Sequence, residues 1–289
     1  THHSNTFFPS DTVETVVVDR GPGNASSLGQ ATFGGSVNLF SRATSDMIGG
    51  TGRLSYGTNN TFLGRVMLQS GSLASLGGTQ ILVGGQYVNT DTVRSNAPYH
   101  QLNLFGKAVI PLGASARLTL LSTYNKNHFN QPDNDGPTLA QVALYGKHYL
   151  LNSDPTTPQY KGYNYTNKTT DFEIATLDIE PAQGVQIVNK TYTYYYNNTT
   201  VTASDTTGAT PNTTYTGAGT LSPSRSTVNG HIPGYTKLNS YRTYGDILKA
   251  MFDFGPATLT AGVWYEWNET PRARFEYDMT AGGPDAMAY

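Results

Sequence analysis

The chain has 289 residues, with 18 basic and 20 acidic side chains and a formal net charge of −2. This near-neutral balance argues against a nucleic-acid partner, which would need a basic face. The chain has no cysteine, so disulfides, thiolate metal sites and cysteine nucleophiles are excluded. No apolar run reaches the ~18 residues of a transmembrane helix, and we therefore expect none.

The first pair of predicted elements spans residues 13–42. A short β-rich run, residues 13–18, stops at Arg20, Gly21 and Pro22, and after a small-residue loop a second short strand follows Gly34 and Gly35. Glycine permits sharp turns and close backbone approach, and proline lacks the N–H that a central strand needs. On local chemistry alone, the pair is equally typical of two strands in any small α+β domain.

The order of these residues resembles the last part of the plug domain of TonB-dependent outer-membrane receptors. Leu28 stands where the family usually has tyrosine, a difference that concerns packing more than mechanism. The resemblance implies that plug charges pair with the inner barrel wall; for Arg20 the alternative is a solvated arginine at a strand end. The matching residues are Val13, Glu14, Val16, Val18, Arg20, Gly21, Pro22, Gly29, Gly34, Gly35, Val37 and Asn38, and Arg42 follows at the expected plug-to-barrel junction.

From residue 51 onward, successive segments alternate apolar and polar residues as β-strands do. In the clearest segment, Leu248, Ala250 and Phe252 point one way and Lys249 and Met251 the other. A soluble β-sandwich gives the same alternation, with its apolar face inward. The predicted strands are 51–57, 61–71, 79–89, 99–110, 115–128, 169–180, 185–197, 240–254 and 257–268.

The connections between these strands differ in length at the two ends of the predicted sheet. Short turns rich in Gly, Pro and Ala alternate with the longer connections 90–98, 129–168 and 198–239. Outer-membrane barrels combine short periplasmic turns with long extracellular loops, and structureless loops of this length are rare in compact soluble domains. The strand ends beside the long loops are rich in aromatic residues, including Trp264 and Trp267, as expected for an interfacial girdle.

We therefore predict an all-β fold, namely part of an antiparallel transmembrane β-barrel with the C-terminal part of an N-terminal plug domain. Residues 1–45 are assigned to the plug and residues 46–289 to the N-terminal part of the barrel, with 129–168 and 198–239 as long extracellular loops. The resemblance implies a barrel of about 22 strands, of which the predicted strands are the first part. We expect an internal piece of a longer protein that does not transport alone, because open sheet edges are costly in hydrocarbon.

The loop 129–168 holds the candidate ligand-binding residues. Residues 133–136 resemble part of a calcium loop, but the later ligands are missing, so a turn stabilised by Asx side chains is preferred. Residues 138–150 have helix-like apolar spacing after Pro137, which predicts a short surface helix. The side chains that could face a ligand are His128, Asp133, Asp135, Tyr145, His148 and Tyr149; ordinary loop packing is the alternative for each.

No nucleophile–histidine–acid set, phosphate-binding loop or zinc motif has recognisable spacing, so we expect no enzyme activity, cofactor or metal site. The resemblance implies active import of a scarce nutrient across the outer membrane of a Gram-negative bacterium, with membrane lipid around the barrel. It also implies TonB as a partner, through a segment missing from this chain. A ferric siderophore or other ferric chelate is the default ligand, and an oligosaccharide or cobalamin is the alternative. Outside the family, the alternative is a secreted β-sandwich adhesion or carbohydrate-binding module.

Overall fold

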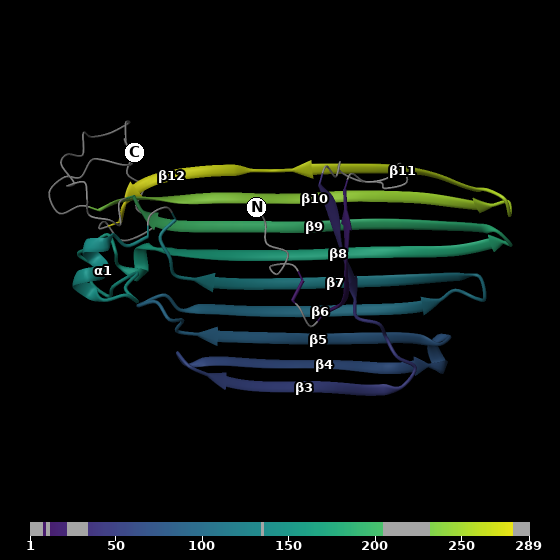
Figure 1. Cartoon of the computed structure of the whole chain (residues 1–289), viewed down its shortest axis with the longest axis horizontal. Coiled ribbons are helices and arrows are strands. Elements are labelled where there is room, and N and C mark those ends of the chain that lie inside the picture. Colours follow the sequence, from purple (N-terminus) through teal and green to yellow (C-terminus); the bar gives the residue numbers. More distant parts are fainter. Residues whose placement is uncertain (1–7, 10–11, 22–33, 134–135, 205–231, 280–289) are drawn as a thin grey trace.

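The computed structural model describes residues 8–9, 12–21, 34–133, 136–204 and 232–279. Within these ranges, β3 to β12 form one antiparallel sheet, and β1 and β2 form a separate two-stranded sheet. The strands of the large sheet lie side by side in chain order, and the narrow β1–β2 pair crosses their direction near the middle of the view (Figure 1). The predicted all-β, antiparallel architecture is confirmed.

Every predicted strand is present, and one further strand was not predicted. The two-stranded sheet, which the sequence analysis assigns to a plug, consists of β1 (Val13–Arg20) and β2 (Gly35–Ser41). The large sheet consists of β3 (Ile48–Gly57), β4 (Thr61–Leu73), β5 (Thr79–Thr90), β6 (Tyr99–Pro111), β7 (Ala116–Phe129), β8 (Tyr165–Ala182), β9 (Val185–Ala203), β10 (Pro233–Asp253), β11 (Thr258–Glu269) and β12 (Arg272–Asp278).

The additional strand, β12, continues the line of β11. Arg242 of β10 pairs with Glu269 of β11, and Asn239 pairs with Arg272 of β12, so the pairing with β10 resumes in the same register. Pro271 lies at the interruption, where its missing N–H prevents a regular ladder bond. β11 and β12 are therefore one long strand with a break at Pro271.

The two ends of the large sheet differ as predicted. At one end, here called the turn end, the connections are short: 74–78, 112–115, 183–184 and 254–257. At the other end, here called the loop end, they are 58–60, 91–98, 130–164 and 204–232. Residues 205–231 of the last connection lie outside the described residues.

Three strands run further toward the loop end than the sequence predicted, so the expected loops 129–168 and 198–239 were too long. β8 starts at Tyr165, β9 ends at Ala203 and β10 starts at Pro233. The added segments are rich in Thr, Asn and Tyr, and Thr200 and Thr202 in them are only 3% and 1% exposed. Because polar residues fill both faces there, the apolar–polar alternation that marks a strand is missing.

Pairing register assigns the side chains of the large sheet to two faces, because directly paired residues point to the same side. On one, the plug-side face, Lys107 Nζ donates to Ser41 Oγ at 3.0 Å and to the Arg42 carbonyl at 2.8 Å. The opposite, outer face carries exposed large apolar side chains: Leu54, Val66, Leu68, Val83, Leu104, Leu120, Leu248, Leu259 and Val263. Apolar side chains therefore face away from the plug, as in a membrane barrel. The described residues contain no second large sheet over this face, which a sandwich would need.

The aromatic residues near the loop end are divided between the two faces. Tyr56, Phe62, Tyr87, Tyr124, Tyr244, Tyr265 and Trp267 lie on the outer face, whereas Phe129, Phe172, Tyr192, Tyr194, Tyr196, Tyr241 and Trp264 lie on the plug-side face. Only the first group is placed to meet a bilayer interface, so the girdle expected from the sequence included too many residues.

The connection 130–164 contains the helix α1 (Leu139–Tyr145), which is shorter than the predicted span 138–150. Thr138 caps it: Gln141 N donates to Thr138 Oγ1 at 3.2 Å, and Thr138 N donates to Gln141 Oε1 at 2.8 Å. This reciprocal capping box satisfies two backbone donors at the helix start. None of the helices in the described ranges has the length and apolar character needed to cross a bilayer.

Candidate plug contact and loop-end site

The plug hairpin depends on a glycine at a strained position. Arg20 of β1 pairs with Gly35 of β2, and Gly21 N donates to the Gly34 carbonyl at 3.3 Å. Gly35 has φ of +138°, and a Cβ there would lie 2.3 Å from the Asp19 carbonyl oxygen. Because only glycine fits such an approach, this motif glycine has a steric explanation. A Cβ on Gly34 would meet nothing within 4 Å.

Two carboxylates of the plug hairpin bind its second strand and the segment that follows it. Asp19 Oδ2 accepts from Asn38 Nδ2 at 2.9 Å and from Ser36 Oγ at 3.3 Å across the two strands. Glu14 Oε2 accepts from the Ala43 backbone N–H at 2.7 Å. Of the motif residues, Asn38 thus contacts the other strand of the hairpin, and Glu14 contacts the segment that follows β2. Arg20 is exposed at the end of β1, Arg42 is half-buried, and Pro22 lies outside the described residues.

The segment 42–47, which joins plug to sheet, is bound to the plug-side face near the turn end. Lys107 contacts its start, as described above. Further along, Thr44 Oγ1 donates to Gln80 Oε1, and Gln80 Nε2 donates to Asp46 Oδ1 at 2.6 Å. The backbone N–H of Ser72 donates to the Asp46 carbonyl at 2.9 Å. Sequence reasoning missed Lys107 and Gln80, because both are ordinary polar residues of predicted strands.

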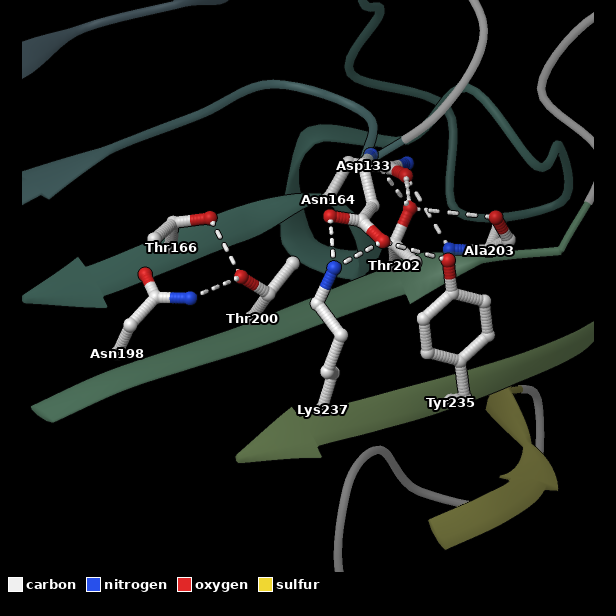
Figure 2. Close-up of polar contacts among 9 residues, drawn as sticks. All are labelled: Asp133, Asn164, Thr166, Asn198, Thr200, Thr202, Ala203, Tyr235 and Lys237. Carbon is white, nitrogen blue, oxygen red and sulfur yellow. Dashed lines mark hydrogen bonds and ion pairs between the residues drawn. The ribbon is translucent and has the colours of Figure 1, made fainter. Parts of the chain in front are cut away.

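At the loop end, Asp133 binds two residues that are about a hundred positions away in the chain. Its carboxylate accepts from Tyr235 Oη at 2.8 Å and from Lys237 Nζ at 2.6 and 2.7 Å. Its backbone N–H donates to Thr202 Oγ1 at 3.2 Å. Figure 2 shows these contacts converging from the connection onto β9 and β10. Since Tyr235 and Lys237 lie on the plug-side face, this connection folds inward across the sheet.

Asn164 completes this loop-end cluster, and its side chain is fully buried. Its Oδ1 accepts from Thr202 Oγ1 at 3.0 Å and from the Ala203 backbone N–H at 3.2 Å. Its Nδ2 donates to the carbonyls of Pro158 at 2.8 Å and Tyr160 at 3.0 Å. With its side-chain hydrogen-bonding capacity used on both sides, Asn164 joins the end of the connection to β9.

The connections 91–98 and 130–164 are joined to each other as well. Ser95 N donates to the His148 carbonyl at 2.8 Å, and Ser95 Oγ donates to the Leu151 carbonyl at 2.8 Å. Asn96 Nδ2 also donates to the Leu151 carbonyl, at 3.0 Å. Leu151 is fully buried at this junction. The two connections therefore form one ordered cap at the loop end.

The structure separates the six candidate ligand residues. His128 lies on the outer face, 2.8 Å from Asn167 Oδ1 through its Nδ1 and stacked on His100 with ring centroids 6.1 Å apart. His148 is exposed. Tyr145 is 61% exposed and packs on Tyr149, which is 7% exposed, with ring centroids 4.6 Å apart. Asp133 is used inside the loop-end cluster, and Asp135 lies outside the described residues.

Two groups of the cap have shifted pKa values with clear causes. Burial raises the pKa of the Tyr149 hydroxyl above its usual range, against a hydrogen bond with Asn152 that lowers it. Hydrogen bonds from the Thr156 side chain and backbone lower the pKa of Asp154, in the Asx turn where Asp154 Oδ1 accepts from Thr156 N at 2.9 Å. Within the described residues, no group of three His, Asp or Glu side chains is placed to hold a metal ion.

No protein-family model matches the chain, and neither does any curated protein. Solved structures do match. They include the siderophore receptor PiuA from Acinetobacter baumannii, with a TM-score of 0.63 and 17% identity. The pyoverdine receptor FpvA from Pseudomonas aeruginosa PAO1 gives 0.62 and 13%, and the ferric-catecholate import receptor Fiu from E. coli K12 gives 0.57 and 16%.

The chain shares its fold with a segment of each of these receptors. The matches cover 92% of this chain for PiuA and FpvA and 97% for Fiu, but only 36%, 36% and 43% of those chains. The chain therefore spans less than half of the length of the receptors that it matches. At these identities the likeness establishes the fold alone.

Proposed function

We propose that the receptor to which this chain belongs lies in the outer membrane of a Gram-negative bacterium and imports a ferric chelate with energy delivered through TonB. Its structural neighbours PiuA, FpvA and Fiu are described as siderophore, pyoverdine and ferric-catecholate receptors. An oligosaccharide or cobalamin is the alternative cargo. The proposed division of the chain is the end of a plug in residues 1–45 and the first part of a barrel in residues 46–289.

The observation that carries the proposal is the plug hairpin with its exit segment held against the polar face of an amphipathic sheet. Lys107, Gln80 and Ser72 of the sheet bind Ser41, Arg42, Thr44 and Asp46. A plug attached to the wall at this point has a fixed end, so a pull applied to an earlier part of the plug would displace that part relative to β1 and β2. Such a displacement opens a path along the plug-side face.

The cap at the loop end supplies the proposed ligand contacts. Tyr145 and His148 are exposed and belong to the cap, so both can meet a ligand without rearrangement. The buried Tyr149 supports Tyr145 by ring contact. Asp133 positions the cap through Lys237 and Tyr235 rather than contacting the ligand. In the motif, Arg20 is the charge proposed to meet the inner wall of the complete barrel.

Radiolabelled iron uptake tests the proposal. Cells that express the full-length receptor, and lack their other ferric-chelate receptors, are given ⁵⁵Fe as ferric citrate, a ferric catecholate or a ferric hydroxamate. We expect uptake of at least one chelate, abolished in a strain without TonB. Uptake of labelled cobalamin or a maltooligosaccharide instead would refute the proposed cargo but support the proposed mechanism. Uptake that does not depend on TonB would refute the mechanism.

A further inference from the structure

A shallow groove of about 570 Å³ crosses the outer face of the large sheet from β5 to β10. Gly106, Ala108, Ser122 and Ala175 form its floor on β6, β7 and β8. Register places these small residues next to one another: Gly106 pairs with Ser122, and Leu120 lies between Ala108 and Ala175. The groove therefore results from short side chains in adjacent rows. Ile81, Val83 and Leu120 border it toward β5, and Glu173, Thr191 and Thr193 border it toward β9.

The loop-end side of the groove carries an ion pair on the same outer face. Arg242 donates to both oxygens of Asp171, at 2.7 and 3.0 Å, and lies 3.9 Å from Glu173, which lines the groove. Tyr244, another lining residue, stacks on Trp267 with ring centroids 5.9 Å apart. Charges on the lipid face of a barrel are costly at the bilayer centre and tolerated near the interface, where aromatic residues also gather. The β8–β10 end of the groove therefore has the character of a bilayer interface, and the groove runs from there across the strands to Ile81 and Val83 of β5.

We propose that this groove is a binding site for one acyl chain of a single bilayer lipid, with the lipid headgroup beside the Arg242–Asp171 pair. The inference rests on the proposed outer-membrane location. Six strands contribute, and five spacings of about 4.8 Å give a length of about 24 Å, enough for an extended acyl chain. Burial of each methylene stabilises the complex. Arg242 is already paired with Asp171 in bidentate geometry. It therefore offers the lipid headgroup polar contacts rather than an unpaired positive charge.

A lipid fits this surface better than a protein partner. The groove is shallow, its floor is apolar, and the charges at its rim are satisfied within the chain, so little is left for a specific protein interface, which uses buried anchors and a polar rim. The surface is also continuous with the apolar outer face that meets hydrocarbon. One chain in a fitted groove exchanges more slowly than the lipid that surrounds the rest of the barrel.

Native mass spectrometry of the full-length receptor tests the site. Dimyristoylphosphatidylethanolamine is added to the detergent-purified receptor, and lipids that remain after mild activation are counted. A Cβ on Gly106 meets nothing within 4 Å, so a side chain can start there, and Gly106→Leu is chosen to fill the groove. We expect the receptor to retain one lipid, and Gly106→Leu to bind it at least tenfold more weakly. Ala175→Leu provides a second way to fill the floor.

Gly52→Leu is the matched control, because Gly52 is an outer-face glycine of β3 whose Cβ would lie 3.8 Å from its nearest neighbour. It should bind lipid like the unchanged receptor. Equal retention in the groove variants and the control would overturn the proposal, as would full displacement of the lipid by glycerophosphoethanolamine, which has no chain. A receptor dimer in place of the lipid would show a protein occupant. The lipid count does not depend on cargo or TonB, so failed import would leave it unchanged.

Discussion

Removal of the Asp133 carboxylate should release the cap at the loop end without unfolding the sheet. In Asp133→Ala, Lys237 loses its ion-pair partner, and the hydroxyl of Tyr235, a residue only 2% exposed, loses its acceptor. A fully exposed ion pair contributes at most about 1 kcal/mol, and a buried hydrogen bond to a charged group contributes about 1.5–3 kcal/mol. The side chains of Lys237 and Asp133 are 39% and 17% exposed, between these limits, so we estimate about 2 kcal/mol.

Hydrogen exchange of the full-length receptor measures this effect locally, because it reports the free energy of opening for each segment. A loss of about 2 kcal/mol corresponds to roughly 30-fold faster exchange in 150–164. Asp133→Asn retains an acceptor for Tyr235 but loses the charge, and should cost about 1 kcal/mol, or roughly fivefold. β11 should exchange at an unchanged rate, because it is remote from the cluster.

The matched control is Asp178→Ala, which removes the partner of Arg117, 3.3 Å away near the turn end. It should leave exchange in 150–164 unchanged. The reasoning is refuted if Asp133→Ala exchanges like the unchanged receptor in this segment, because the cap would then be held without the ion pair. It is equally refuted if β11 accelerates as much as the cap, because the effect would then be global.

Three further predictions concern the plug, the cap helix and pH. Gly35→Ala should destabilise the plug hairpin by about 2 kcal/mol through its clash with the Asp19 carbonyl, seen as faster proteolysis of the plug, whereas Gly34→Ala should leave cleavage unchanged; equal cleavage of both would contradict the steric argument. Thr138→Ala should weaken α1 by about 1 kcal/mol and accelerate hydrogen exchange in 139–145. An unchanged rate would mean that α1 does not need the Thr138 side chain at its N-terminus. Burial raises the pKa of Tyr149, so its contribution to stability is complete below about pH 10 and is lost as pH rises through the raised pKa; exchange of the cap should accelerate there, and Tyr149→Phe should remove that dependence.

The sequence predicted the strands well wherever one face is apolar. The turn ends of β5, β7 and β9 lie within a residue of the predicted ones, because Gly- and Pro-containing turns mark them and apolar and polar residues alternate in the strands that follow. At the loop end this signal disappears. β9 continues to Ala203 through Thr202, which binds the cap, and nothing local distinguishes such a segment from a polar loop.

The candidate site was less predictable than the fold. Asp133 was selected for its Asx-rich surroundings, but its partners Tyr235 and Lys237 follow from strand register across a long connection. Lys107 is one of several strand lysines, and only the return of the chain from the plug places Ser41 beside it. The division of aromatic residues between the two faces likewise depends on register, which composition at a strand end does not contain.

Between the anchored exit segment and the loop-end cluster, the plug-side face of β6 to β10 is polar and carries few charges, Lys168 among them, whereas β3 and β4 add Arg53 and Arg65. In one transverse row of paired residues, the part on β6 to β10 consists of Asn103, Asn125, Thr170, Tyr196 and Tyr241, and all five are at most 9% exposed. The same row continues through Gln86 to Arg65 and Arg53 on β4 and β3. Among the described residues, Asn103 Oδ1 and Asn125 Nδ2 have no hydrogen-bond partner. Neutral hydrogen bonds are individually weak, whereas breaking a buried ion pair costs about 3–5 kcal/mol. The β6 to β10 part of this face is therefore suited to many weak, exchangeable hydrogen bonds rather than to fixed ion pairs.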